Sequence, residues 1–93
     1  MTGAVPPYDR DARLKELELD PTGWGSVDLG NLLAAWTYSS RPLGWSGEAA
    51  KTLWYHTSDP GRLNMVMPSS DGLALTIVEQ VVWLCREARR LGL

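Results

Sequence analysis

The sequence contains no phenylalanine, only one cysteine and only one histidine, and each shortage excludes some structure or chemistry. A single cysteine, Cys85, cannot form a disulfide within the chain, and no metal-ligand spacing surrounds it or His56. We therefore expect a reducing, cytoplasmic setting, with no metal and no cofactor. Because phenylalanine is absent, the five tryptophans must fill much of the core.

Long apolar runs are missing too. No segment approaches the ~20 continuous apolar residues of a membrane span, and the first residues lack the basic start and apolar centre of a secretion signal. We expect a protein that is neither secreted nor inserted in a membrane. The net charge of −2 argues against broad, charge-driven adhesion to nucleic acid, so any such binding must rest on a local patch.

The chain of 93 residues, 44% of them hydrophobic, is predicted to form one domain over residues 9–93, preceded by an N-terminal arm over residues 1–8. A first helix begins near Asp9 and buries Leu14 and Leu17. It ends at Asp20-Pro21, because a residue before proline is driven out of the helical region.

A short strand is predicted at Trp24 to Val27, followed by a second helix that Asp28 caps with its carboxylate. The apolar residues of this helix follow the spacing i, i+3, i+4 and i+7, at Leu29, Leu32, Leu33 and Trp36. Small residues such as Gly30 on its other side would let another segment approach closely.

Residues 37–45 hold two serines, a proline and a glycine, which predicts a loop. A third helix is predicted from Gly47 to His56, with Leu53 and Trp54 on its buried edge. Its opposite edge would present the recognition surface Glu48, Lys51, Thr52 and Tyr55.

The turn Asp59-Pro60-Gly61 is predicted to lead into a strand. Alternating apolar residues in 63–67 and 73–77, on either side of Ser69 to Gly72, predict a β-hairpin in which Met65 lies beside Leu75. An alternative is one long helix from Gly72 to Leu91, because short apolar runs are ambiguous between strand and helix.

In both alternatives residues 79–91 form a C-terminal helix with a buried stripe that includes Cys85. Trp83 falls on the face opposite that stripe, among Gln80, Arg86 and Glu87. A large indole on a polar face is covered by another segment of the chain or anchors a partner.

The order of these elements is that of a small α+β winged-helix domain, with three helices, a β-hairpin wing and a C-terminal helix. Residues 22–33, Thr-Gly-Trp-Gly-Ser-Val-Asp-Leu-Gly-Asn-Leu-Leu, resemble the opening of LOTUS (OST-HTH) domains. Gly44-Trp45-Ser46, residues 62–66 and the Asp71-Gly72 turn fit the later helix and wing of that family. A Gly-Trp before a helix is also similar to the N-terminal winged domain of RNA 2'-phosphotransferases.

The LOTUS resemblance implies binding of RNA, or docking onto a protein through the helical face. Carried over to this chain, it makes Lys51, Thr52 and Tyr55 on the third helix and Arg62 beside the wing candidate contacts. Arg41, in the preceding loop, could reach a phosphate. The chain lacks the further basic residues expected on that helix, and nothing in it resembles an attached nuclease or phosphotransferase domain.

Two binding functions follow, and neither is enzymatic. The first is a module that contacts RNA or DNA through the five residues just named, and the second is a protein-interaction or homo-oligomeric module that uses Trp83 and the C-terminal helix. An enzyme ranks third, because neighbours in a turn such as His56 and Asp59 rarely converge on one reacting atom. We interpret His56 as a residue that caps the third helix and Cys85 as a small core residue.

Overall fold

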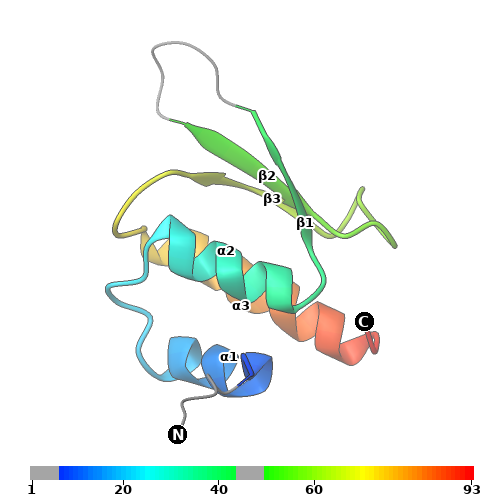
Figure 1. The fold of residues 1–93 in the computed structure, drawn as a ribbon, viewed down its shortest axis with the longest axis horizontal. Helices are drawn as coiled ribbons and strands as arrows, with labels where there is room; N and C mark the ends of the chain where they lie inside the picture. The colour runs from blue at the N-terminus through cyan, green and yellow to red at the C-terminus, as the bar shows by residue number, and fades with distance from the viewer. Residues whose placement is uncertain (1–6, 44–49) are drawn as a thin grey trace, which may run out of the picture.

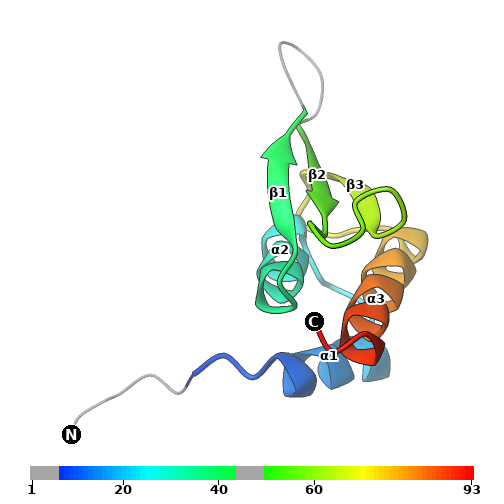
Figure 2. The same ribbon diagram turned by 90° about the vertical axis from the view of Figure 1, so that its right-hand side faces the viewer.

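The structure is a computed structural model, and it describes residues 7–43 and 50–93. Within those ranges three helices and one three-stranded antiparallel sheet form a small α+β domain. Their order is α1 (Arg10–Leu19), α2 (Ser26–Ala35), β1 (Ser39–Pro42), β2 (Lys51–Tyr55), β3 (Asn64–Pro68) and α3 (Leu75–Arg90). The sheet covers one side of the α2–α3 pair and α1 packs on the other, so the fold has three layers (Figure 1, Figure 2).

Helix α1 agrees with the sequence prediction. The Asp9 carboxylate accepts a hydrogen bond of 3.0 Å from the amide of Ala12 at its start, and Asp20 ends it. Two arginines then hold α1 against the helix layer by stacking on indoles: Arg10 lies 4.1 Å from the ring centroid of Trp36, and Arg13 lies 4.5 Å from that of Trp24.

Helix α2 begins earlier than predicted. Its N-cap is Gly25, and the Asp28 carboxylate accepts from the Gly25 amide at 3.3 Å, so Asp28 stabilises the first turn from inside the helix. The short strand predicted at Trp24 to Val27 is wrong, because Val27 belongs to α2 and its side chain is 74% exposed. Trp24 is buried as expected.

Two of the three strands, β1 and β2, lie in a part of the chain that was predicted to be a loop and a helix, whereas β3 lies where a strand was predicted. Strand β1 lies within the predicted loop 37–45, and β2 occupies the second half of the predicted helix 47–56. The run Thr52 to Tyr55 consists of β-branched, aromatic and branched aliphatic residues that favour a strand. Residues 44–49 of these two predictions lie outside the described residues, as do residues 1–6 of the predicted arm.

The β-hairpin predicted from residues 63–77 is wrong, because β3 pairs with β2 and residues from Leu75 onward are helical. Met65 faces Trp54 in the ladder, instead of Leu75. The backbone between β3 and α3 pairs with the start of α2: the Ser26 amide donates to the Ser70 carbonyl at 2.8 Å, and the Leu73 amide donates to the Trp24 carbonyl at 3.1 Å. These bonds divert the chain from a hairpin return, and the alternative of one long helix is closer to the structure.

The core lies between the three layers, and α2 meets the sheet through Gly30. A Cβ atom at Gly30 would lie 2.9 Å from the Trp54 ring, so only glycine lets this indole reach the helix surface. All the helices and β3 contribute buried side chains, the largest fully buried ones being Leu14, Leu17, Leu29, Leu32, Leu33, Trp36, Leu63, Met67 and Leu84.

The two elements that define a winged helix after the second helix, a third helix and a hairpin wing, are therefore replaced by β2 and by the β3–α3 segment. Residues 51–55 have no helical recognition face. Any contact made by Lys51, Thr52 or Tyr55 is therefore made from a strand.

Candidate functional site

Among residues 7–43 and 50–93, helices cover one face of the sheet and leave the other open. Because paired residues in an antiparallel ladder point to the same side, the register assigns every strand residue to a face. Met65 and Met67 are buried and mark the helix-covered face, whereas Val66 between them is exposed. The open face therefore carries Ser39 and Arg41 from β1, Lys51, Leu53 and Tyr55 from β2, and Asn64, Val66 and Pro68 from β3.

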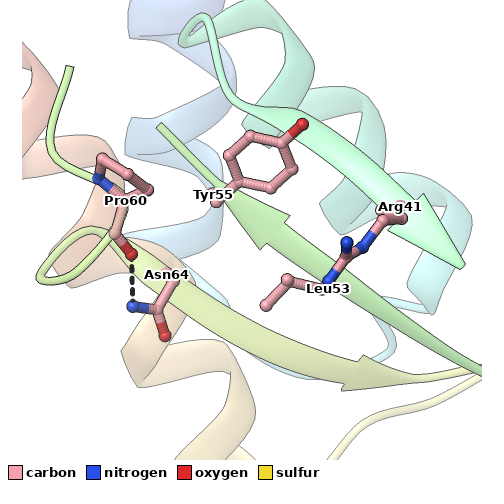
Figure 3. A pocket seen from close by; sticks show the side chains of 5 residues that line it. All are labelled: Arg41, Leu53, Tyr55, Pro60 and Asn64. Atoms are coloured by element: carbon pink, nitrogen blue, oxygen red, sulfur yellow. Dashed lines mark hydrogen bonds between the residues drawn. The ribbon is translucent and has the colours of Figure 1, made fainter. Parts of the chain in front are cut away.

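An open pocket of about 440 Å³ lies on this face, lined by Arg41, Leu53, Tyr55, Pro60 and Asn64. Figure 3 shows the Tyr55 ring and the Arg41 side chain on neighbouring strands, with Leu53 beside the Arg41 guanidinium and Asn64 next to Pro60. The side-chain amide nitrogen of Asn64 donates to the Pro60 backbone carbonyl at 2.7 Å (Figure 3). The side-chain carbonyl oxygen of Asn64 takes no part in that bond. The pocket therefore has an aromatic ring, a guanidinium and an amide around an aliphatic floor.

The charges on the open face are all of one sign. Of its eight residues, Arg41 and Lys51 are cationic and none is acidic. Arg41 faces Leu53, so Lys51 and Tyr55 are its two diagonal neighbours, roughly 7–8 Å away across the ladder. This face is locally basic although the whole chain carries a net charge of −2.

Three of the five candidate contacts, Arg41, Lys51 and Tyr55, thus lie on one surface, although on strands. Thr52 lies on the opposite face, where it lines a small pocket with Trp54, Met67 and the first turn of α2. Because this pocket lies between the sheet and α2, the prediction that Thr52 shares a surface with Lys51 and Tyr55 is wrong.

Arg62 lies beyond the strands and is held by carboxylates. Its guanidinium donates to Glu87 at 2.8 Å and to Asp59 at 3.1 Å, and the pKa of Arg62 is raised mainly by the bond to Glu87. Hydrogen bonds from Arg90 and then from Arg62 lower the pKa of Glu87 to about 2. The charge of Arg62 is therefore already balanced, and the open face does not include it.

Trp83 is exposed on α3, as its position in the sequence predicted. The Trp83 side chain lines a second groove, between α1 and α3. The Arg62 guanidinium lies 5.8 Å from the centroid of the Trp83 ring. Trp83 and the open face of the sheet are separate surfaces, because α3 packs on the covered side of the sheet.

His56 is buried at the end of β2 in a cluster that sequence reasoning missed. Its Nδ1 accepts from the Ser58 amide at 3.1 Å, so the ring proton is on Nε2, which lies 2.7 Å from the Thr37 hydroxyl. Thr37 has a φ of 71°, and its hydroxyl donates to the Trp36 carbonyl. With its proton on Nε2, His56 donates to Thr37 and stabilises the turn before β1; the helix-cap interpretation is wrong.

The other reactive groups are built into the core. Burial raises the pKa of the Cys85 thiol to about 12, so it packs as the small core residue that was predicted. Burial likewise raises the pKa of Tyr38, whose hydroxyl donates to the Leu84 carbonyl at 2.7 Å.

Among residues 7–43 and 50–93, three or more His, Cys, Asp or Glu side chains nowhere gather closely enough to hold a metal ion. No helix in the same ranges is both long enough and apolar enough to cross a membrane. Comparisons with models of known protein families, with curated proteins and with solved structures give no significant match to this chain.

Proposed function

We propose that this domain is a non-enzymatic binding module for single-stranded nucleic acid, and that the open face of its sheet is the binding surface. The observation that carries the proposal is the position of Arg41, Lys51 and Tyr55 on one uncovered face without an acidic residue among the eight strand residues there. Sheets with exposed aromatic and cationic side chains bind single strands by stacking and by neutralising phosphates.

Six residues of the open face have a chemical role in this proposal. The Tyr55 ring stacks on a base, and the guanidinium of Arg41 pairs with a phosphate or stacks beside the same base. The free carbonyl oxygen of Asn64 accepts a hydrogen bond from a base edge. Lys51 contacts the next phosphate along the strand. Leu53 and Val66 form the apolar surface between these groups.

Two cations on the face set the strength of the electrostatic contribution. If each neutralises one phosphate, the logarithm of the affinity should fall with the logarithm of the salt concentration with a slope of about −1.4, since one contact on a single strand contributes about −0.7. Such a shallow slope is consistent with the negative net charge of the chain, and we expect weak affinity without strong sequence preference.

The decisive experiment measures fluorescence anisotropy of labelled single-stranded RNA and DNA oligonucleotides as the protein is added at low salt. Lys51→Glu and Tyr55→Ala should each weaken binding, and Lys51→Glu should also make the salt slope shallower by at least about 0.7. Lys15→Glu is the matched control, because Lys15 is exposed on α1 and the substitution makes the same change in net charge.

Equal effects of Lys51→Glu and Lys15→Glu would show that only net charge matters and would refute the assignment of the sheet face. If neither RNA nor DNA binds the wild-type protein, the proposal is wrong, and the face is then better tested with peptides that add a strand to the edge at β1.

A further inference from the structure

A row of exposed or half-buried side chains runs along the outer side of α3 at helical spacing: Leu75, Glu79, Val82, Trp83 and Arg86. They form one wall of a groove of about 420 Å³, and α1 with the turn after it forms the other wall. This surface is distinct from the sheet face and is not used by the function proposed above.

Apolar groups on this row are unusually exposed. Trp83 is 46% exposed and Leu75 is 56% exposed, and Val82 lies half-buried between them and the groove. The Arg62 guanidinium lies 5.8 Å from the centroid of the Trp83 ring. Partly covered tryptophans beside an apolar groove are the side chains that most often anchor an interface.

The charges on the row are self-complementary. The midpoint between Val82 and Trp83 is equally far along the helix from Glu79 and from Arg86. When two copies of α3 cross antiparallel at that midpoint, Glu79 of each chain lies opposite Arg86 of the other, and Trp83 of each lies opposite Val82. A parallel crossing would place like charges opposite each other.

The two charged groups have the capacity for this contact. Glu79 has no ion-pair partner in the part of the chain that the structure describes. Arg86 already donates to Glu18 through Nε at 2.7 Å, and a guanidinium has five N–H donors, so it can donate to a second carboxylate without releasing the first.

We propose that this protein forms a homodimer through α3, with two antiparallel copies of the helix that bury Trp83 and pair Glu79 with Arg86 of the second copy. A single helix pair is a small interface, so the dimer should dissociate on dilution. Sedimentation equilibrium of the full chain between about 10 μM and 1 mM should show a mass that rises from 10.3 kDa toward twice that value.

Three variants test the geometry. Trp83→Ala should raise the dissociation constant at least about tenfold. Glu79→Arg should be monomeric alone, because the new guanidinium would face Arg86 of the second copy. The double variant Glu18→Gln/Arg86→Glu should also be monomeric, because its new carboxylate would face Glu79 of the second copy. The loss of the Glu18 carboxylate in that variant prevents repulsion from the new carboxylate within the chain.

An equimolar mixture of the two charge variants, Glu79→Arg and Glu18→Gln/Arg86→Glu, should dimerise again. In the mixed dimer the guanidinium introduced at position 79 of one chain lies opposite the carboxylate introduced at position 86 of the other. The native Arg86 of the first chain then lies opposite the native Glu79 of the second. Each charge therefore meets its opposite in the other chain.

Arg41→Glu, on the sheet face, is the control and should leave the dimer unchanged, and circular dichroism should confirm that every variant is folded. A wild-type mass that stays at 10.3 kDa over the whole concentration range would overturn the proposal. So would a dimer that is insensitive to Trp83→Ala and Glu79→Arg, or a mixture of the two charge variants that stays monomeric.

Discussion

Replacing Gly30 with alanine tests how closely α2 and the sheet are packed. In an exposed helix interior this substitution stabilises a protein by about 1 kcal/mol, because alanine has the higher helix propensity. Here the new Cβ atom would lie 2.9 Å from the Trp54 ring, which is held between α2 and the sheet. Relieving such a contact costs about 1–3 kcal/mol, so we expect a net loss of as much as about 2 kcal/mol.

The sign of the effect should reverse when the ring is removed. In a Trp54→Leu background, Gly30→Ala should stabilise the fold by about 1 kcal/mol, which gives a coupling energy between the two positions of about 1–3 kcal/mol. Urea unfolding followed by far-ultraviolet circular dichroism measures all four free energies. Asn31→Ala, at the exposed neighbouring position, is the control and should have the same effect in both backgrounds. Equal effects of Gly30→Ala in the two backgrounds would refute the packing argument.

Two further predictions concern stability. The ion pairs with Arg90 and Arg62 lower the pKa of Glu87 from 4.5 to about 2, so the stability that the Glu87 carboxylate adds is complete above pH 4.5 and is lost as the pH falls toward 2. The melting temperatures of wild type and Glu87→Gln should therefore differ at pH 7 and converge between pH 4.5 and pH 2. A difference that stays constant over this range would contradict the ion pairs. Gly25→Ala places a Cβ atom 2.7 Å from the Asp71 carbonyl oxygen and should destabilise the fold by about 1–3 kcal/mol. The control Gly61→Ala, which meets nothing within 4 Å, should change stability by less than about 0.5 kcal/mol in the same urea titrations.

The helices were predictable from the sequence wherever one face is buried and the other is exposed to solvent. Leu14 and Leu17 of α1 are completely buried, as are Leu29 and Leu32 of α2. Each helix also has a side exposed to solvent, where Lys15, Asn31 and Gln80 lie, so the apolar residues repeat with the helical period. Trp83 falls on the solvent side of α3 by the same helical period, and it is 46% exposed.

Strand β2 was not predicted because it lies in the centre of the sheet. Thr52, Leu53, Trp54 and Tyr55 are all half-buried, so the alternation of exposed and buried residues that identifies a strand is missing. In the sequence, Leu53 and Trp54 also fit a helical spacing with Ala49 and Ala50, which favoured a helix. The run of strand-favouring residues was the signal that could have corrected the prediction.

The opposite error was made at the start of α3, where a strand was predicted although Leu75 begins a helix. The reason is that the apolar residues alternate there as in a strand, at Leu73, Leu75 and Ile77. Leu75 is 56% exposed, so the alternation did not reflect a buried sheet face. What decides the structure is the backbone of residues 70–73, which bonds to the start of α2. Contacts between segments so far apart in the sequence have no local signature.

The two proposed surfaces lie on different layers, so binding and dimerisation should be separable. The open face of the sheet points away from the helix layer that contains α3 (Figure 2). An oligonucleotide long enough to reach both sheets of a dimer should bind wild type more tightly than the monomeric Glu79→Arg variant, because the second contact becomes intramolecular. A short oligonucleotide that fills one pocket should bind both proteins equally. Weaker binding of the short oligonucleotide to Glu79→Arg would contradict the separation of the surfaces, since the substitution would then act on the sheet itself.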